Sequence, residues 1–545
     1  MTKLFFLLCS VILSSAHLFA QEVNIIPQPM QVTTIAGNFV ISPATTLVVV
    51  NNRDKPTATF LNKYLLKHYG FKLSIANNAA NNYIKLSSLQ NVDGLKAEGY
   101  NLQSDSEGVR IEGKSAKGTF HGMQTLIQLL PAEKGNNLKI ASVNITDGPR
   151  FAYRGAMLDA GRHFFPVSFI KKYIDYLALH KLNYFHWHLT EDQGWRIEIK
   201  KYPNLTKTGA WRNGTIIGRY PGKGNDNIAY GGFYTQEEVK DIVKYASDRF
   251  ISVIPEIEMP GHSSAAIAAY PMLSCFPQEK TNIPDNMIAE KSKLELSNGR
   301  VKLVQETWGV HSDVFAPTEY TFKFLEDVLD EVLALFPSKY IHVGVDESPK
   351  DAWKKSEFCQ QLIKEKGLKD EHGLQSYFIQ RMEKYINKKG RTLIGWDEIL
   401  EGGLAPNAIV MSWRGEEGGI AAAKEKHKVI MTPGSHVYLD HSQTTNEDSV
   451  TIGGLLTLGK VYSYEPVPKE LNEQEAKYVL GAQGNVWTEY MSNPYKVEYM
   501  IFPRLSALSE VLWSPKENKN WPAFQAKMET MMQRYKIWGT NFFKE

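Results

Sequence analysis

The sequence predicts an α/β protein made of a (β/α)8 (TIM) barrel preceded by a small α+β domain. Three observations indicate this fold. Strand-like runs alternate with amphipathic helical stretches eight times in the region 149–514. Polar and aromatic residues recur where these strands end. No glycine-rich nucleotide-binding turn follows the first strand, as an open doubly wound sheet would lead one to expect.

Length and composition limit the number of domains and the classes of function that need to be considered. The chain has 545 residues, of which 43% are hydrophobic and 22% charged, which is ordinary for a globular protein of more than one domain. A net charge of +3 over such a length gives no reason to expect nucleic-acid binding. After the first 20 residues no run of about 20 apolar residues occurs, so no membrane span is expected.

The N-terminus has the character of a targeting segment. Residues 1–20 combine an early lysine, an apolar run and small residues before the polar sequence QEVN. This predicts a secretory signal peptide cleaved near Ala20, and therefore export to the periplasm, the cell surface or the medium. Cys275 and Cys359 would then be the only cysteines of the mature chain, and the sequence leaves open whether they pair.

Residues 21–148 predict the small α+β domain. Short β-like runs such as TTLVVV, NYIKLS and GVRIEG mix with two helix-like stretches, 57–69 and 116–130. Gly70 follows the first stretch, where a helix commonly ends. We expect no chemistry from this domain.

Eight strands are predicted for the barrel, which spans 149–514. In order they are AMLDAG (156–161), NYFHWHL (183–189), SVIPEIE (252–258), YIHVGV (340–345), TLIGWD (392–397), IVMSW (409–413), KVIMTP (428–433) and YVLGAQGNVW (478–487). Helical stretches such as FIKKYIDYLALHKL and TQEEVKDIVKYASDRF follow most of them, with apolar residues recurring at three and four. A long excursion, 265–320, is expected to wall the site, and 515–545 to form a terminal helix with its connecting loop.

Unusual side chains stand at the carboxyl end of every predicted strand, where a barrel gathers its functional groups. In strand order they are Asp159 and Arg162, His188 and Asp192, His262, Asp346 and Glu347, Trp396, Trp413, Tyr438 and Asp440, and Trp487 and Glu489. Each of these residues taken alone would more often be structural. Their recurrence at all eight strand ends favours one common site.

The adjacent pair Asp346 and Glu347 is the most informative feature. Carboxylates at a strand end are typical of sugar chemistry or of a metal site. In most glycosidases the two acids come from different strands and stand about 5 Å or more apart, which neighbours on one strand do not fit easily. A third arrangement arises when the substrate carries its own nucleophile, a 2-acetamido carbonyl. One acid then protonates the leaving oxygen and its neighbour orients the acetamide.

Seven segments of the chain form a distinctive ordered set: LDAGRHF (158–164), HWHLTEDQGW (186–195), PEIEMPGHS (255–263), HVGVDE (342–347), GWDE (395–398), YLD (438–440) and GNVWTE (484–489). Together and in this order they resemble glycoside hydrolase family 20, the β-N-acetylhexosaminidases. The resemblance runs from about residue 21 to about residue 515. It implies retaining, substrate-assisted hydrolysis of terminal β-linked N-acetylhexosamine from glycans, without a cofactor or a metal.

Carried over residue by residue, the resemblance implies five catalytic residues. Glu347 would be the general acid and then the base. Asp346 would receive the acetamide N–H and stabilise the oxazolinium-like intermediate, and Tyr438 would donate its hydroxyl to the acetamide oxygen. Asp192 and His262 would form a relay behind Glu347 that tunes its pKa.

The resemblance also implies two sets of substrate-binding residues. Trp396, Trp413 and Trp487 would enclose the acetyl methyl group and the apolar face of the sugar. A second set, Arg162, Asp440 and Glu489, would hydrogen-bond ring hydroxyls.

The sequence departs from the family pattern at Val345, where a glycine is usual. A side chain there must point into the barrel wall or into the site, so we expect altered local packing with both carboxylates in place. In TEDQGW two acids adjoin, Glu191 and Asp192, and the relay is assigned to Asp192 from its position relative to QGW.

Two other function classes stay open. A metal-dependent barrel hydrolase would use His186, His188, His262 and Asp192, and a chelator would abolish its activity. A non-catalytic sugar-binding relative would keep the tryptophan-lined pocket, although it has no need of a buried acid pair. The sequence does not distinguish glucosamine from galactosamine substrates, nor does it give the oligomeric state.

Overall fold

The computed structural model describes residues 23–89, 94–447 and 449–544. The predicted signal peptide, 1–20, lies outside these ranges. Among the helices of these ranges, none combines the length and the hydrophobicity of a membrane span.

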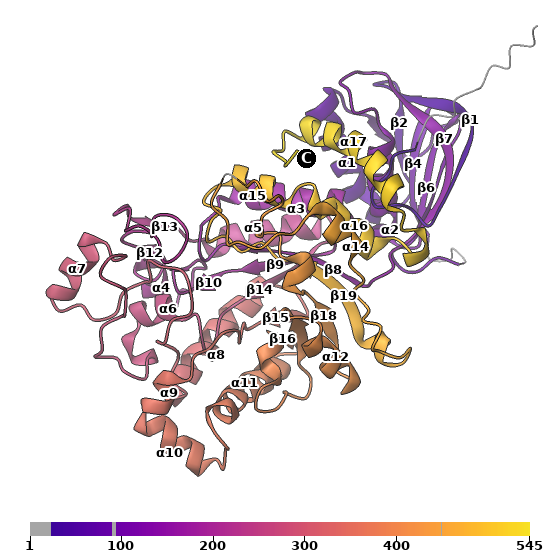
Figure 1. The fold of residues 1–545 in the computed structure, drawn as a ribbon. Coiled ribbons are helices and arrows are strands. Elements are labelled where there is room, and N and C mark those ends of the chain that lie inside the picture. Colours follow the sequence, from indigo (N-terminus) through magenta and orange to yellow (C-terminus); the bar gives the residue numbers. More distant parts are fainter. Residues whose placement is uncertain (1–22, 90–93, 448, 545) are drawn as a thin grey trace, which may run out of the picture.

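The N-terminal domain is a seven-stranded mixed sheet, drawn in indigo and violet in Figure 1, with two helices against it. The spatial order of its strands is β1-β7-β5-β6-β4-β2-β3. Their bounds are β1 Gln31–Ile41, β2 Thr46–Val49, β3 Ser74–Ala76, β4 Tyr83–Ser88, β5 Tyr100–Ser104, β6 Gly108–Gly113 and β7 Leu138–Asp147.

Both predicted helices of this domain are present. α1 (Lys55–Tyr69) ends at Gly70, whose φ of 83° lies in the left-handed region that a residue without a Cβ adopts readily. α2 (Ala116–Leu129) begins after Ser115, whose side chain accepts a hydrogen bond from the backbone N–H of Gly118. Apolar residues of both helices join the hydrophobic core.

Eight parallel strands close into a barrel, which confirms the predicted fold class. Around the barrel the order is β8-β9-β14-β15-β16-β17-β18-β19, and β19 pairs with β8. Their bounds are β8 Tyr153–Asp159, β9 Tyr184–His188, β14 Ser252–Glu256, β15 Tyr340–His342, β16 Thr392–Trp396, β17 Ile409–Ser412, β18 Val429–Met431 and β19 Val479–Gly484.

Helices surround the strands (Figure 1). The principal ones are α3 Val167–Leu179, α5 Gln236–Ser247, α8 Glu319–Leu335, α11 Glu371–Lys388, α12 Glu417–Lys424, α14 Leu458–Ser463 and α16 Arg504–Trp513. α5 starts at a capping box in which Thr235 and Glu238 satisfy each other's backbone N–H groups. The terminal helix α17 (Trp521–Trp538) lies beside α1, and the Trp538 indole N–H donates to the Tyr64 hydroxyl at 3.0 Å.

Buried polar contacts fix the sheet domain to the barrel. Asp147, at the end of β7, accepts hydrogen bonds from the Trp513 indole at 3.0 Å, the Lys181 ammonium at 2.9 Å and the Tyr100 hydroxyl at 2.6 Å. All four side chains are buried, so the carboxylate is held in a fixed position between the domains.

Two long connections rise beside the mouth of the barrel. The first carries the short pair β12 (Trp211–Arg212) and β13 (Tyr230–Gly231), and the second carries α6 (Ser264–Ala269) and α7 (Glu290–Ser297). The second is the predicted excursion, and it places Gly309 and Val310 on the pocket wall. Cys275, in the same excursion, is a free thiol whose Sγ lies 3.9 Å from Sγ of Cys359.

Candidate active site

A pocket of about 390 Å³ opens at the carboxyl ends of the strands. Nine of the eleven predicted site residues line it: Arg162, Asp346, Glu347, Trp396, Trp413, Tyr438, Asp440, Trp487 and Glu489. The other two, Asp192 and His262, lie buried directly behind the acid pair. The structure therefore brings all the predicted residues together, while their individual roles stay predictions.

The backbone bends sharply where the acid pair begins. β15 ends at His342, three residues earlier than predicted, because Gly344 (φ 67°) and Val345 (φ 83°) leave the extended conformation. Glu347 also has a positive φ, 46°. Such a conformation is an outlier for a β-branched residue, and strain of this kind is commonly concentrated at functional sites.

The side chain of Val345 faces the barrel wall. It is completely buried, and a Cβ placed at Gly395 of β16 would lie 3.3 Å from its Cγ2. The valine therefore fills space between two strands and leaves the pocket to Asp346 and Glu347. This settles the direction of the side chain that departs from the family pattern.

The two acids occupy different environments. The Asp346 side chain is only 10% exposed, whereas that of Glu347 is 42% exposed. Burial raises the pKa of Asp346 to about 6, although the neighbouring imidazolium of His262 opposes the shift. A buried, pre-oriented carboxylate suits electrostatic stabilisation, and a more exposed one suits proton exchange with substrate and water.

His262 links the acid pair to two further carboxylates. Its Nδ1 lies 3.0 Å from Asp192 Oδ2 and 2.8 Å from Glu191 Oε1. Its Nε2 lies 3.6 Å from Asp346 and 3.7 Å from Glu347. Burial works against a charged imidazole here, but Glu191 and Asp346 outweigh it and raise the pKa of His262 well above its ordinary value. The imidazole of His262 therefore lies within 4 Å of both acids of the pair, and Asp192, the residue predicted for the relay, shares it with Glu191.

Aromatic rings form the wall of the pocket. The ring centroids of Trp396 and Trp487 lie 5.8 Å apart, and those of Trp413 and Tyr438 lie 6.2 Å apart at an interplanar angle of 21°. The Arg162 guanidinium lies over Trp487 at 4.8 Å. Flat apolar surfaces of this kind suit the C–H face of a sugar ring and a methyl group.

Three buried carboxylate oxygens in the pocket are hydrogen-bond acceptors without a donor among the described residues. Asp346 Oδ1, Asp440 Oδ1 and Glu489 Oε2 have no partner among the residues that the structure describes. Burial raises the pKa of both Asp440 and Glu489, an effect that the Arg162 guanidinium opposes in each case. Unsatisfied buried acceptors are costly, so their convergence on one pocket indicates a ligand rich in hydroxyl or amide donors.

Sequence reasoning missed several residues at the mouth of the pocket. Tyr220, Trp308, Val310 and Tyr490 line it, and the Tyr220 backbone N–H donates to the Tyr490 hydroxyl at 3.0 Å. They come from irregular connections, in which no hydrophobic period predicts a direction. For the three aromatic residues the only signal in the sequence was the aromatic content of loops between strands, and for Val310 there was none.

Glu398 is a further carboxylate that the sequence analysis did not assign. It accepts a hydrogen bond from the Trp413 indole at 3.0 Å, and burial raises its pKa to about 8. The motif GWDE placed it beside Trp396, but the partner indole comes from the next strand. Glu398 and Trp413 become neighbours only when the barrel closes.

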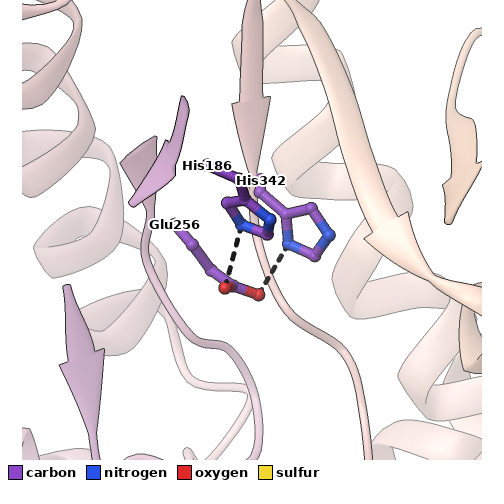
Figure 2. A group of neighbouring side chains, drawn as sticks. All are labelled: His186, Glu256 and His342. Atoms are coloured by element: carbon purple, nitrogen blue, oxygen red, sulfur yellow. Dashed lines mark ion pairs between the residues drawn. The ribbon is translucent and has the colours of Figure 1, made fainter. Parts of the chain in front are cut away.

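Three groups of buried histidines and carboxylates have the spacing of metal ligands. They are His186, Glu256 and His342 (Figure 2); His188, Glu256 and Glu258; and Glu191, Asp192 and His262. In the first two groups Glu256 lies within hydrogen-bond distance of three imidazole nitrogens and the Trp396 indole. Glu256 already accepts hydrogen bonds from His188 and from the Trp396 indole and lies against the rings of His186 and His342, so a network of protein contacts is the better interpretation of these two groups.

Two family models match the chain. "Glycosyl hydrolase family 20, domain 2" matches residues 22–148, and "Glycosyl hydrolase family 20, catalytic domain" matches residues 151–516. The first corresponds to the sheet domain and the second to the barrel.

Curated relatives and solved structures agree with these models. A β-hexosaminidase of Porphyromonas gingivalis is 48% identical over 536 residues, 96% of this chain and 65% of that protein. One of Vibrio furnissii is 35% identical over 90% of this chain and 76% of its own.

Among solved structures, the exo β-N-acetylglucosaminidase of Vibrio harveyi in complex with N-acetylglucosamine superposes with a TM-score of 0.83 and 31% identity. That match covers 96% of this chain and 78% of that chain. The family resemblance and the predicted enzyme class are thereby confirmed: the chain belongs to glycosyl hydrolase family 20.

Proposed function

We propose that this protein is an exo-acting, retaining β-N-acetylhexosaminidase that removes terminal non-reducing N-acetylglucosamine or N-acetylgalactosamine from glycans. The observation that carries the proposal is the pocket itself. It combines an adjacent acid pair, an aromatic wall and three buried carboxylate oxygens that have no hydrogen-bond donor among the described residues. The names of the relatives, including a structure with bound N-acetylglucosamine, support the same substrate class.

The proposed reaction begins with the substrate's own acetamide. Its carbonyl oxygen attacks the anomeric carbon while Glu347 gives a proton to the departing glycosidic oxygen, so the glycosidic bond breaks as the oxazolinium ring forms. Asp346 accepts the acetamide N–H and offsets the positive charge that develops on the ring. An intramolecular carbonyl has an effective molarity that can reach roughly 10⁵ M or more, so the protein need only orient it.

The second half of the reaction reverses the role of Glu347. The carboxylate now removes a proton from water, which attacks the anomeric carbon and reopens the ring. Two displacements on the same carbon retain the β configuration. Tyr438 would donate its hydroxyl to the acetamide oxygen in both steps, and Trp396, Trp413 and Trp487 would enclose the acetyl methyl group.

The aryl N-acetyl-β-glucosaminide should be a far better substrate than the matching aryl β-glucoside. The glucoside lacks the nucleophile and leaves the polar atoms of Asp346 and Tyr438 without partners. We expect kcat/KM for the glucoside to be lower by at least about 10⁴, the scale at which sites built for a hydrogen-bonding group reject its absence. Comparable values for the two chromogenic substrates would refute the proposal, and activity on neither would favour a sugar-binding protein.

The acid limb of the pH profile should lie near pH 6. Asp346 must be charged to stabilise the intermediate, and its pKa of about 6 means that it becomes neutral as the pH falls through this value. The limb of log kcat/KM should move to higher pH in His262→Gln, because the imidazolium charge that lowers the pKa of Asp346 is then lost. If the acid limb of His262→Gln stays at the same pH as in wild type, a group other than Asp346 controls this limb.

We further propose that the protein is exported, on the evidence of residues 1–20 alone. N-terminal sequencing of the mature protein from its native host should begin near Gln21, and an intact Met1 in the purified protein would overturn this.

A further inference from the structure

Glu256 ends strand β14 beneath the floor of the pocket and takes no direct part in the proposed reaction. It is completely buried. Figure 2 shows its carboxylate beside the neighbouring rings of His186 and His342, with one oxygen directed at each ring; the two histidines come from β9 and β15. His186 Nε2 lies 3.0 Å from Oε2, and His342 Nδ1 lies 2.7 Å from Oε1. His188 Nδ1 also contacts Oε2.

The same carboxylate reaches one residue of the pocket wall. The Trp396 indole N–H donates to Glu256 Oε1 at 2.9 Å, and the Trp396 ring is only 1% exposed. An indole so deeply buried needs an acceptor for its N–H, and Glu256 is that acceptor. Since the carboxylate also contacts imidazoles from two neighbouring strands, it cannot follow the indole if the ring turns.

Charge reinforces this arrangement. Burial alone would favour a neutral Glu256, but the three imidazoles hold its pKa well below the ordinary value. The pKa of His188 is raised to about 10, burial being outweighed chiefly by the charge of Glu256. Glu256 and His188 therefore form a buried ion pair, and the hydrogen bond to Trp396 is charge-assisted.

We propose that Glu256 is a positioning residue that fixes the Trp396 ring from below and thereby sets the size of the N-acyl group that the pocket accepts. This inference rests on the proposed function, because it takes Trp396 as a wall of the acetyl site. A ring anchored at its N–H excludes acyl groups longer than acetyl. A ring without this anchor gains freedom to move and admits them.

The test compares two aryl β-glucosaminides that differ only in the acyl group, N-acetyl and N-propanoyl. The quantity measured is the ratio of kcat/KM for propanoyl to kcat/KM for acetyl. In Glu256→Gln the hydrogen bond to the indole loses its charge assistance, and this ratio should rise about ten-fold over wild type. His188 also contacts Glu191 at 3.2 Å, so a disturbance could reach the relay. A fault in the relay would slow both substrates equally and leave the ratio unchanged.

Asp147→Asn is the matched control. Asp147 is also a buried carboxylate that accepts a tryptophan N–H, from Trp513 at 3.0 Å, but it lies between the domains and outside the pocket. Both substitutions should lower Tm, and only Glu256→Gln should change the acyl ratio. An unchanged ratio in Glu256→Gln, or an equal rise in Asp147→Asn, would overturn the proposal.

A second variant covers the case in which Glu256→Gln does not fold. Replacing Trp396 with benzothienylalanine keeps the ring shape and puts sulfur in place of the N–H, so the anchor is lost while Glu256 keeps its imidazoles. The same rise in the ratio is expected, and an unchanged ratio would again overturn the proposal. Failure of the proposed function is distinguishable, because the wild type would then hydrolyse neither substrate.

Discussion

Asp346→Asn should lower kcat by about 10² to 10³, the range found when a preoriented group that stabilises transition-state charge is removed. The amide keeps the size of the side chain but cannot offset the positive charge of the oxazolinium. Because that charge develops only during the reaction, the loss should appear mainly in kcat and much less in KM. It should be similar for activated and unactivated leaving groups, since the charge develops with both.

Folding should survive this substitution. Burial already raises the pKa of Asp346, so the folded state gains when the charge is removed, and Tm at pH 7 should stay equal or rise. Asp327→Asn is a suitable control, because Asp327 pairs with Lys201 and Lys323 away from the pocket and its loss should leave kcat unchanged. A stable thiazoline mimic of the intermediate should bind Asp346→Asn much more weakly than wild type. Equal binding would make Asp346 merely a structural neighbour of Glu347.

Glu347→Gln should cost about 10² to 10⁴ in kcat/KM on a methyl glycoside, which needs a proton on its leaving oxygen. The loss should be much smaller on a dinitrophenyl glycoside, whose leaving group departs without protonation. With this substrate the variant forms the oxazolinium intermediate quickly. The attack of water on that intermediate, which now lacks a general base, then limits kcat. Steady-state rates on both substrates and a pre-steady-state burst on the dinitrophenyl glycoside measure this. An equal loss of kcat/KM on both would show that Glu347 is not the general acid.

The barrel was predictable because its signals are local and repeated. Each strand is a short apolar run, and a parallel barrel necessarily brings the carboxyl ends of its strands to one face. Residues as distant in sequence as Arg162 and Glu489 therefore reach the same pocket. The position of Val345 was foreseen only in part, because its φ of 83° depends on how β15 leaves the sheet.

The supporting residues could not be predicted in the same way. Glu256 makes its contacts with residues of β9, β15 and β16, and no spacing along the chain links these partners. Glu191 shares His262 with Asp192, yet the sequence showed only two adjacent acids. Tyr220 and Trp308 lie in irregular connections whose path is set by tertiary packing.

The nucleophilic role of the substrate's acetamide is the central claim, and fluorination of that group tests it most directly. We would measure kcat/KM for one aryl β-glucosaminide bearing N-acetyl, N-fluoroacetyl, N-difluoroacetyl and N-trifluoroacetyl groups. Fluorine withdraws electrons from the carbonyl oxygen, but each fluorine also enlarges the methyl group. The N-propanoyl substrate, whose acyl group is similar in size to trifluoroacetyl and is not electron-poor, therefore serves as the steric reference. If that oxygen attacks the anomeric carbon, kcat/KM must fall steeply at each step of the series. Values that stay level across the four substrates would contradict the account, because a nucleophile supplied by the protein or by water would not respond to the fluorines.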